Sequence, residues 1–118
     1  MVNSVVTGMQ TVPIIASQQI VQRTIPTLER SVDDAIAGKP AVVDVVMSGV
    51  LMIDSAGLNW LLLVQSRLEK LGMRMRLLDP SPIMADVLLA TRLDSRFTVE
   101  VTGLSEPLRN GNGGGDGR

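Results

Sequence analysis

The chain contains no cysteine and no histidine among its 118 residues. It therefore forms no disulfide and offers no thiolate or imidazole to a metal ion. The same absence removes the Ser-His and Cys-His pairs that activate nucleophiles, and histidine as a general acid or base. Most familiar catalytic machinery is therefore excluded, and we expect no catalytic residue, no metal site and no cofactor.

Aromatic residues and basic clusters are also scarce. One Phe, one Trp and no Tyr are present, so Val, Ile, Leu, Met and Ala must build the core. Eleven basic residues against twelve acidic ones give a net charge of −1, without a run of Lys or Arg. Such a chain has no obvious source of counterion release on nucleic acid. The composition predicts a helix-flanked sheet and no nucleic-acid partner.

Long apolar runs are missing as well. No run approaches the ~20 residues that span a bilayer, and the start, MVNSVVTGMQ, has neither a positive nor a continuously apolar region. We therefore expect no membrane insertion and a cytoplasmic location. The last nine residues, NGNGGGDGR, contain five Gly and no apolar side chain, too little to offset the entropy of ordering. Residues 1–109 are predicted to form one domain and residues 110–118 a flexible tail.

Apolar spacing along the chain predicts alternating strands and helices. Short β-branched runs before residue 24 favour one or two edge strands. The other predicted elements are a helix over 24–38, a central buried strand over 41–47, a helix over 55–71, a strand over 73–78, a helix with Ser81 as N-cap, and a strand over 97–101. This order predicts an α/β fold with right-handed crossovers and a site at the carboxyl ends of the strands.

Asp54 and Ser55 lie at such a strand end, directly before an apolar helix. One interpretation is that Ser55 caps the helix, which stabilises it by ~1 kcal/mol relative to alanine. As a nucleophile Ser55 has no histidine base. A serine exposed at a helix N-terminus can instead carry a phosphate, which the helix dipole attracts and the charge of Asp54 repels. The sequence predicts an N-cap or a reversible switch at Ser55.

The predicted helix over 55–71 carries an apolar stripe away from its core side. Ala56, Trp60, Leu63 and Arg67 follow at i, i+4, i+7 and i+11, beside the polar Asn59. Trp and Arg are favoured at protein interfaces, so we expect a docking surface there. The alternative is that Trp60 folds down over the loop or the sheet edge. The residues expected to face the sheet are Leu58, Leu61, Leu62, Val64, Leu68 and Leu71.

These motifs together resemble the STAS domain, the family of anti-sigma factor antagonists and sulfate-transporter tails. The family pattern contains SGV, an apolar residue followed by IDSSGL, a helix, Gly, a strand, NPSP, a helix ending in TGL, and then F.V. The residues that match it are Ser48, Gly49, Val50, Ile53, Asp54, Ser55, Gly57, Leu58, Gly72, Pro80, Ser81, Pro82, Thr91, Leu93, Phe97 and Val99.

The resemblance implies a STAS fold with a mixed, mostly parallel sheet of four to five strands and helices packed largely on one side. In sporulation-type antagonists the phosphorylated serine is the second of the DSSG pair, and this chain has Ala56 there. Stressosome-type STAS proteins are phosphorylated directly after the Asp, the place of Ser55. Arg92 stands where the family usually has Gly, and Val46 where many members have Asp.

The resemblance predicts a non-catalytic anti-sigma factor antagonist that binds an anti-sigma factor with serine-kinase activity and is switched by phosphorylation at Ser55. The alternative is an accessory subunit docked on the cytoplasmic ATPase of a lipid or anion transporter. A third interpretation is nucleotide or small-ligand binding at the strand ends, although no Gly-rich phosphate loop is visible. A homodimer is also left open. The residues predicted to bind the partner are Asp54, Ser55, Ala56, Gly57, Asn59, Trp60, Leu63 and Arg67.

Overall fold

The computed structural model describes residues 10–102 and contains a four-stranded sheet with the strand order β1-β3-β5-β6. The strands β2 and β4 form a separate two-stranded pair. Every pairing among the described residues is parallel. The elements are β1 (Thr11–Ile15), β2 (Gln19–Ile20), α1 (Ile25–Ala37), β3 (Val42–Val46), β4 (Met52–Ile53), α2 (Ser55–Lys70), β5 (Arg74–Leu78), α3 (Pro82–Ala90) and β6 (Thr98–Glu100), with one-turn helices η2 (Gln22–Thr24) and η3 (Leu93–Ser95).

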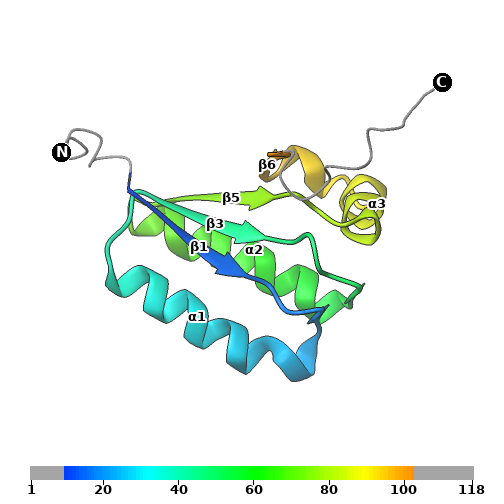
Figure 1. Ribbon diagram of the computed structural model, residues 1–118, viewed down its shortest axis with the longest axis horizontal. Helices are drawn as coiled ribbons and strands as arrows, with labels where there is room; N and C mark the ends of the chain where they lie inside the picture. Colours follow the sequence, from blue (N-terminus) through cyan, green and yellow to red (C-terminus); the bar gives the residue numbers. More distant parts are fainter. Residues whose placement is uncertain (1–9, 103–118) are drawn as a thin grey trace.

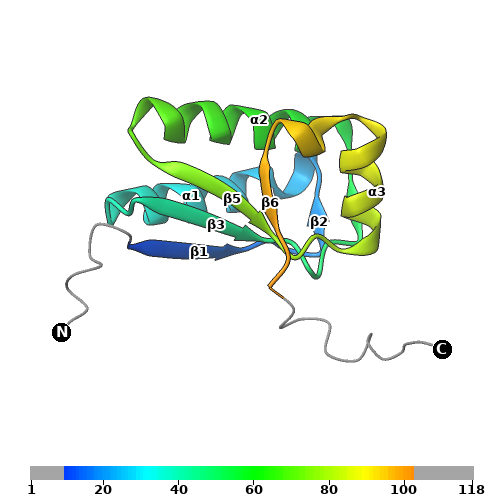
Figure 2. The same cartoon turned by 90° about the horizontal axis from the view of Figure 1, so that it is seen from above.

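The helices are distributed as the sequence predicts. Figures 1 and 2 show α1 and α2 side by side on one face of the main sheet, while α3 lies beyond the carboxyl end of β5. Parallel neighbours need a crossover, and α1 and α2 supply it between β1, β3 and β5. The predicted α/β fold, with a mostly parallel sheet and helices on one side, is confirmed.

The core lies between the sheet and the two long helices. In β3, Val43 and Val45 point toward the helices and are completely buried, as are Leu77 of β5 and Leu61 and Leu68 of α2. Burial of each such aliphatic side chain stabilises the fold by roughly 1.5–3 kcal/mol. An aliphatic core of this kind is what the scarcity of aromatic residues predicts.

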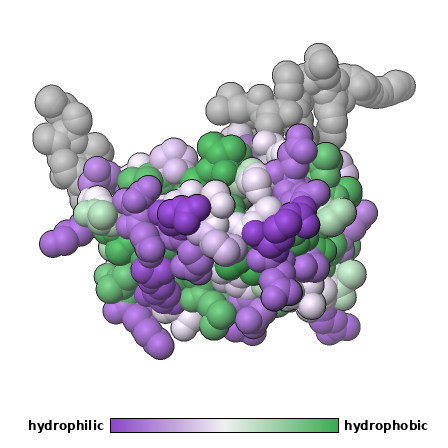
Figure 3. Space-filling model, turned by 90° about the horizontal axis from the view of Figure 1, so that it is seen from below, coloured by the Kyte–Doolittle hydropathy of each residue, from purple (hydrophilic) through white to green (hydrophobic). Residues whose placement is uncertain are grey.

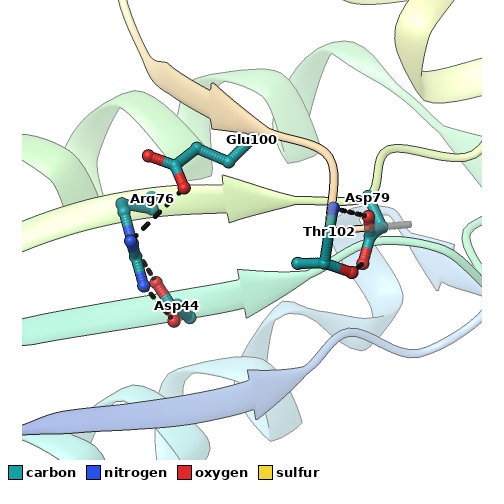
Figure 4. Close-up of polar contacts among 5 residues, drawn as sticks. All are labelled: Asp44, Arg76, Asp79, Glu100 and Thr102. Carbon is teal, nitrogen blue, oxygen red and sulfur yellow. Dashed lines mark hydrogen bonds and ion pairs between the residues drawn. The ribbon is translucent and has the colours of Figure 1, made fainter. Parts of the chain in front are cut away.

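The opposite face of the sheet carries a polar network at its centre (Figure 4). Arg76 of β5 donates two hydrogen bonds to Asp44 of β3, from Nε to Oδ1 at 2.7 Å and from Nη2 to Oδ2 at 2.8 Å. Its third nitrogen reaches Glu100 of β6 at 3.4 Å. The Asp44 side chain is only 7% exposed, and its hydrogen bonds raise the pKa of Arg76. A buried aspartate within a Val-rich strand is therefore paired in bidentate geometry.

Two positions of the family pattern lie in the left-handed backbone region. Asp79, where the family has the Asn of NPSP, has φ 50°; its two carboxylate oxygens accept hydrogen bonds from the backbone N–H and the hydroxyl of Thr102, each at 2.7 Å (Figure 4). Arg92, where the family usually has Gly, has φ 64°. Asp and Asn tolerate this region, whereas Arg is strained there.

Most predicted boundaries agree with the structure. Ser81 caps α3 by accepting a hydrogen bond from the backbone N–H of Met84, and Gly72 ends α2 with φ 78°. Within residues 10–102, no helix is long and apolar enough to cross a bilayer. The predicted domain end at residue 109 and the predicted tail over 110–118 lie outside the described residues.

Candidate functional site

Asp54, and not Ser55, is the N-cap of α2. Its Oδ1 accepts a hydrogen bond from the backbone N–H of Gly57 at 2.8 Å, while Ser55 is the first residue of the helix. Its Oδ2 accepts one from the backbone N–H of Gln22 at 3.1 Å. The bonds from Gly57 and Gln22 favour the ionised carboxylate and lower the pKa of Asp54. The predicted capping role of Ser55 is therefore wrong, because its neighbour fills it.

Gly57 lets β2 approach the first turn of α2. A Cβ atom at this position would lie 2.0 Å from the carbonyl oxygen of Ile20 and 2.9 Å from its carbonyl carbon. Only glycine fits so close to another backbone. The motif therefore fixes where the helix begins in two ways, through the Asp54 hydrogen bonds and through the Gly57 contact with β2.

Ser55 lies exposed on this fixed turn. Within residues 10–102, no hydrogen bond holds its hydroxyl. As the first helical residue it stands at the positive end of a 16-residue helix. Asn59, one turn further on, is also exposed, whereas Ala56 is half-buried and Gly57 is buried. The Ser55 hydroxyl is therefore accessible, and the Asp54 hydrogen bonds and the Gly57 contact hold the turn that carries it.

Trp60 belongs to the core, contrary to the prediction that it lies on an exposed stripe. It is 3% exposed, and its indole Nε1 donates a hydrogen bond of 2.7 Å to Oε2 of Glu29 on α1. The ribbon of α2 runs beside that of α1 (Figure 2), and the bond to Glu29 places Trp60 on the side of α2 that faces α1. The helical spacing predicts the correct side of α2 for Trp60, but a second helix covers that side.

Of the other residues in the predicted stripe, Arg67 contacts α1 and Leu63 is exposed. Arg67 forms ion pairs with Glu29 at 3.3 Å and with Asp33 at 2.7 Å, both on α1. Leu63 is 59% exposed, as predicted for a docking residue. Leu71 was expected to face the sheet but is 51% exposed. The stripe is therefore not continuous, since Trp60 and Arg67 join α2 to α1.

Two exposed apolar residues that lie shortly before Ser55 in the chain were not predicted from the sequence. Leu51 and Met52 precede the motif and are 59% and 51% exposed. Their backbone N–H groups donate to the carbonyl of Gln18, at 2.7 Å and 3.2 Å, which holds the segment beside β2. We call Leu51, Met52, Ser55 and Asn59 the α2 N-terminal surface. The apolar run Val50–Ile53 alone does not distinguish its exposed residues from its buried ones.

The arrangement offers binding chemistry. Among the described residues, no group of three or more acidic side chains is placed to hold a metal ion. The site combines an anion-attracting helix terminus, a free hydroxyl and exposed apolar side chains. This combination suits contact with another protein and modification by a phosphate.

Comparisons with known proteins agree with this description. Two solved structures share the fold: a protein from Thermotoga maritima assigned as an anti-sigma factor antagonist, at 22% identity and TM-score 0.64 over 80% of this chain and 83% of that one, and the anti-sigma factor antagonist SpoIIAA in its unphosphorylated form, at 20% identity and TM-score 0.60 over 84% and 86%. No curated protein sequence matches. The STAS domain model matches residues 7–104, and the chain therefore belongs to the STAS domain family.

Proposed function

We propose that the chain is a non-catalytic, cytoplasmic anti-sigma factor antagonist, which binds an anti-sigma factor with serine-kinase activity and releases it when Ser55 is phosphorylated. The observation that carries the proposal is the exposed Ser55 hydroxyl on a helix start fixed by Asp54 and Gly57. The partner contacts the α2 N-terminal surface. Asp54, Ala56 and Gly57 shape this surface, while Trp60 and Arg67 support it through α1.

The turn that carries Ser55 is held in place by hydrogen bonds, and this supports the proposal that the same surface binds the partner and is phosphorylated by it. The Asp54 carboxylate joins residues 32 positions apart in the chain, so the acceptor turn is already in place before a partner arrives. Preorganised surfaces lose less conformational entropy on binding. Leu51 and Met52, shortly before Ser55 in the chain, add exposed apolar area, and such area contributes to affinity when a partner covers it.

A phosphate on Ser55 supplies the release step. It adds ~1.5–2 negative charges next to Asp54, three to four residues after the exposed Met52 and Leu51. The charge and its hydration must then be accommodated in a contact that is otherwise apolar, which is costly. The helix dipole offsets part of this cost in the free protein. Phosphorylation therefore favours the dissociated state.

Ala56 supports a second candidate function. The usual acceptor position of sporulation-type antagonists has no hydroxyl in this chain. A STAS subunit that stays docked on the cytoplasmic ATPase of a membrane transporter needs no acceptor at either position. In that case the same surface binds constitutively, and Ser55 contributes only to contact.

Retrieval of the native partner, followed by a kinase assay, tests the proposal. The tagged chain is isolated from its own cells after cross-linking, and the partner is identified and purified. Incubation with the partner and ATP should place phosphate on Ser55 and on no other residue, as mapped by mass spectrometry. Ser66→Ala is the matched control, since Ser66 is an exposed serine on the same helix, and it should leave phosphorylation unchanged while Ser55→Ala abolishes it. A transporter ATPase as partner, with Ser55 unmodified, would establish the second candidate.

A further inference from the structure

A groove opens between the second halves of α1 and α2, away from Ser55. Two adjoining cavities form it, of about 510 Å³ and about 430 Å³, and they share Ile36 of α1 and Leu71 at the end of α2. We call them together the α1–α2 groove. The face on which α1 lies is mostly hydrophilic with apolar patches between the hydrophilic ones (Figure 3). The lining of the groove includes the apolar side chains of Ile36, Leu63 and Leu71.

The apolar part of the groove is exposed to solvent. Leu63 and Leu71 line it and are 59% and 51% exposed, while Ile36 is half-buried beneath them. Two such leucines on one helix, about two turns apart, expose apolar area that gains from being covered. Their spacing along α2 is ~12 Å, which two turns of another helix match.

The rim of the groove is positively charged. Lys39, Arg67 and Lys70 line the two cavities, and no carboxylate does. Arg67 is paired with α1, but within residues 10–102 neither lysine forms an ion pair. Lys39 also has φ 51°, a conformation in which glycine or asparagine costs less. Position 39 therefore carries a cationic side chain in a turn whose backbone conformation suits glycine or asparagine better.

We propose that the α1–α2 groove binds an amphipathic helix of a partner protein, with aliphatic residues on one side and Asp or Glu flanking them. The aliphatic side chains contact Ile36, Leu63 and Leu71, and the carboxylates pair with Lys39 and Lys70. A groove between two helices is a common site for a third helix. Two unpaired lysines are fewer than the four to eight cations typical of anionic-membrane binding, so a protein segment is the better occupant.

The groove is separate from the α2 N-terminal surface. Along the axis of α2, Leu63 lies ~12 Å and Leu71 ~24 Å from Ser55, and the buried Trp60 stands between the two surfaces. The residues that line the groove do not include Ser55. Binding of a helical peptide to the groove can therefore be measured on the unphosphorylated chain, so this inference is tested apart from the proposed function.

Selection from a displayed library of 16-residue helical peptides tests the proposal. The full chain serves as bait, with Leu63→Glu as counter-selection. The expected consensus has aliphatic residues at i, i+4 and i+7 with flanking Asp or Glu. In fluorescence anisotropy the selected peptide should bind at least ~10-fold more weakly to Leu63→Glu and to Lys39→Glu/Lys70→Glu. Leu89→Glu, at an exposed leucine of α3, should bind it like the unchanged chain.

Exchanging the charges sharpens the test. A peptide with Lys in place of its acidic residues should bind Lys39→Glu/Lys70→Glu better than the unchanged chain. The proposal is overturned by a basic or neutral consensus, by the lack of any consensus that depends on Leu63, or by equal loss of binding in Leu89→Glu. It is also overturned if Leu63→Glu abolishes self-association in sedimentation, or binding to phosphatidylglycerol vesicles, while no acidic peptide binds. A second copy or a membrane would then be the occupant.

Discussion

The two ends of α2 differ in what fixes them. At the first end, Asp54 and Gly57 contact the backbone of a distant segment, and a short motif specifies the geometry. At the second end, Gly72 closes the helix in the left-handed region, and the surrounding surface is exposed leucine and lysine without a motif. A close contact with backbone allows only one or two residue types at a position. A surface contact requires only that the side chain be apolar or carry the right charge. A binding surface can therefore lie in a region that contains no recognisable sequence motif.

Trp60 divides the two ends, and replacing it should have the largest effect on stability. Trp60→Ala removes a buried side chain and leaves Glu29 without its indole donor, so we expect a loss of ~3–5 kcal/mol in the free energy of unfolding. Urea unfolding followed by circular dichroism measures it, because the variant lacks the only tryptophan. Leu63→Ala, at an exposed position, should cost less than ~0.5 kcal/mol. Equal costs for both variants would contradict the division of α2 described above.

Gly57→Ala should break the first end of the helix. The new Cβ would meet the carbonyl oxygen of Ile20 at 2.0 Å, so β2 or α2 must move, at a cost of ~3 kcal/mol, the upper part of the range for overpacking. Gly72→Ala, at the second end, meets no atom within 4 Å and should cost only the ~1 kcal/mol of a left-handed alanine. Gly49→Ala is the control, because it has neither a close neighbour nor a positive φ. A smaller loss for Gly57→Ala than for Gly72→Ala would overturn the comparison.

The charge of Asp54 should make the first end sensitive to acid. Its folded-state pKa lies below the ordinary value of 3.8, so its contribution is present above the unfolded pKa and is lost as the pH falls through the folded pKa. The difference in unfolding free energy between the unchanged chain and Asp54→Ala should therefore be largest at neutral pH and shrink in the carboxylate range. Asp54→Asn can cap without a charge, so the difference in unfolding free energy between Asp54→Asn and Asp54→Ala should not change with pH in this range. A difference that grows on acidification would refute the assignment.

Arg92→Gly should give the smallest effect, and a gain. Arg92 has φ 64°, a backbone conformation that favours glycine. At Gly57, by contrast, a larger residue is excluded by the nearby backbone of Ile20. Glycine relieves the backbone strain but loses more entropy on folding, so we expect a net increase of ~0.5–1 kcal/mol in unfolding free energy. Arg92→Ala should show no comparable gain. If alanine stabilises as much as glycine, the arginine side chain and not the backbone is the source of the cost.

Local patterns predicted most of the fold because each element contains its own signals. The Val-rich strand, the cap at Ser81 and the stop at Gly72 depend on neighbouring residues, and the structure confirms all three. Two of the errors, at Ser55 and at Trp60, depend on distant residues. Asp54 and Ser55 are both good caps, and Gln22 in another segment favours Asp54. On an isolated helix, Trp60 would lie on an exposed side that suits docking. In the folded chain α1 covers that side, and Glu29 accepts a hydrogen bond from the indole.

The affinity of the native partner for the two phosphorylation states tests the central claim most directly. Unmodified chain and chain phosphorylated completely on Ser55 are titrated against the purified partner by calorimetry, with the Ser66→Ala variant treated in the same way. Charge placed inside a contact with exposed apolar residues should weaken binding by at least ~10-fold, or ~1.4 kcal/mol, with the same loss in the control. Equal affinity of the unmodified and phosphorylated chains would contradict the switch and leave Ser55 as a contact residue of a constitutive interface.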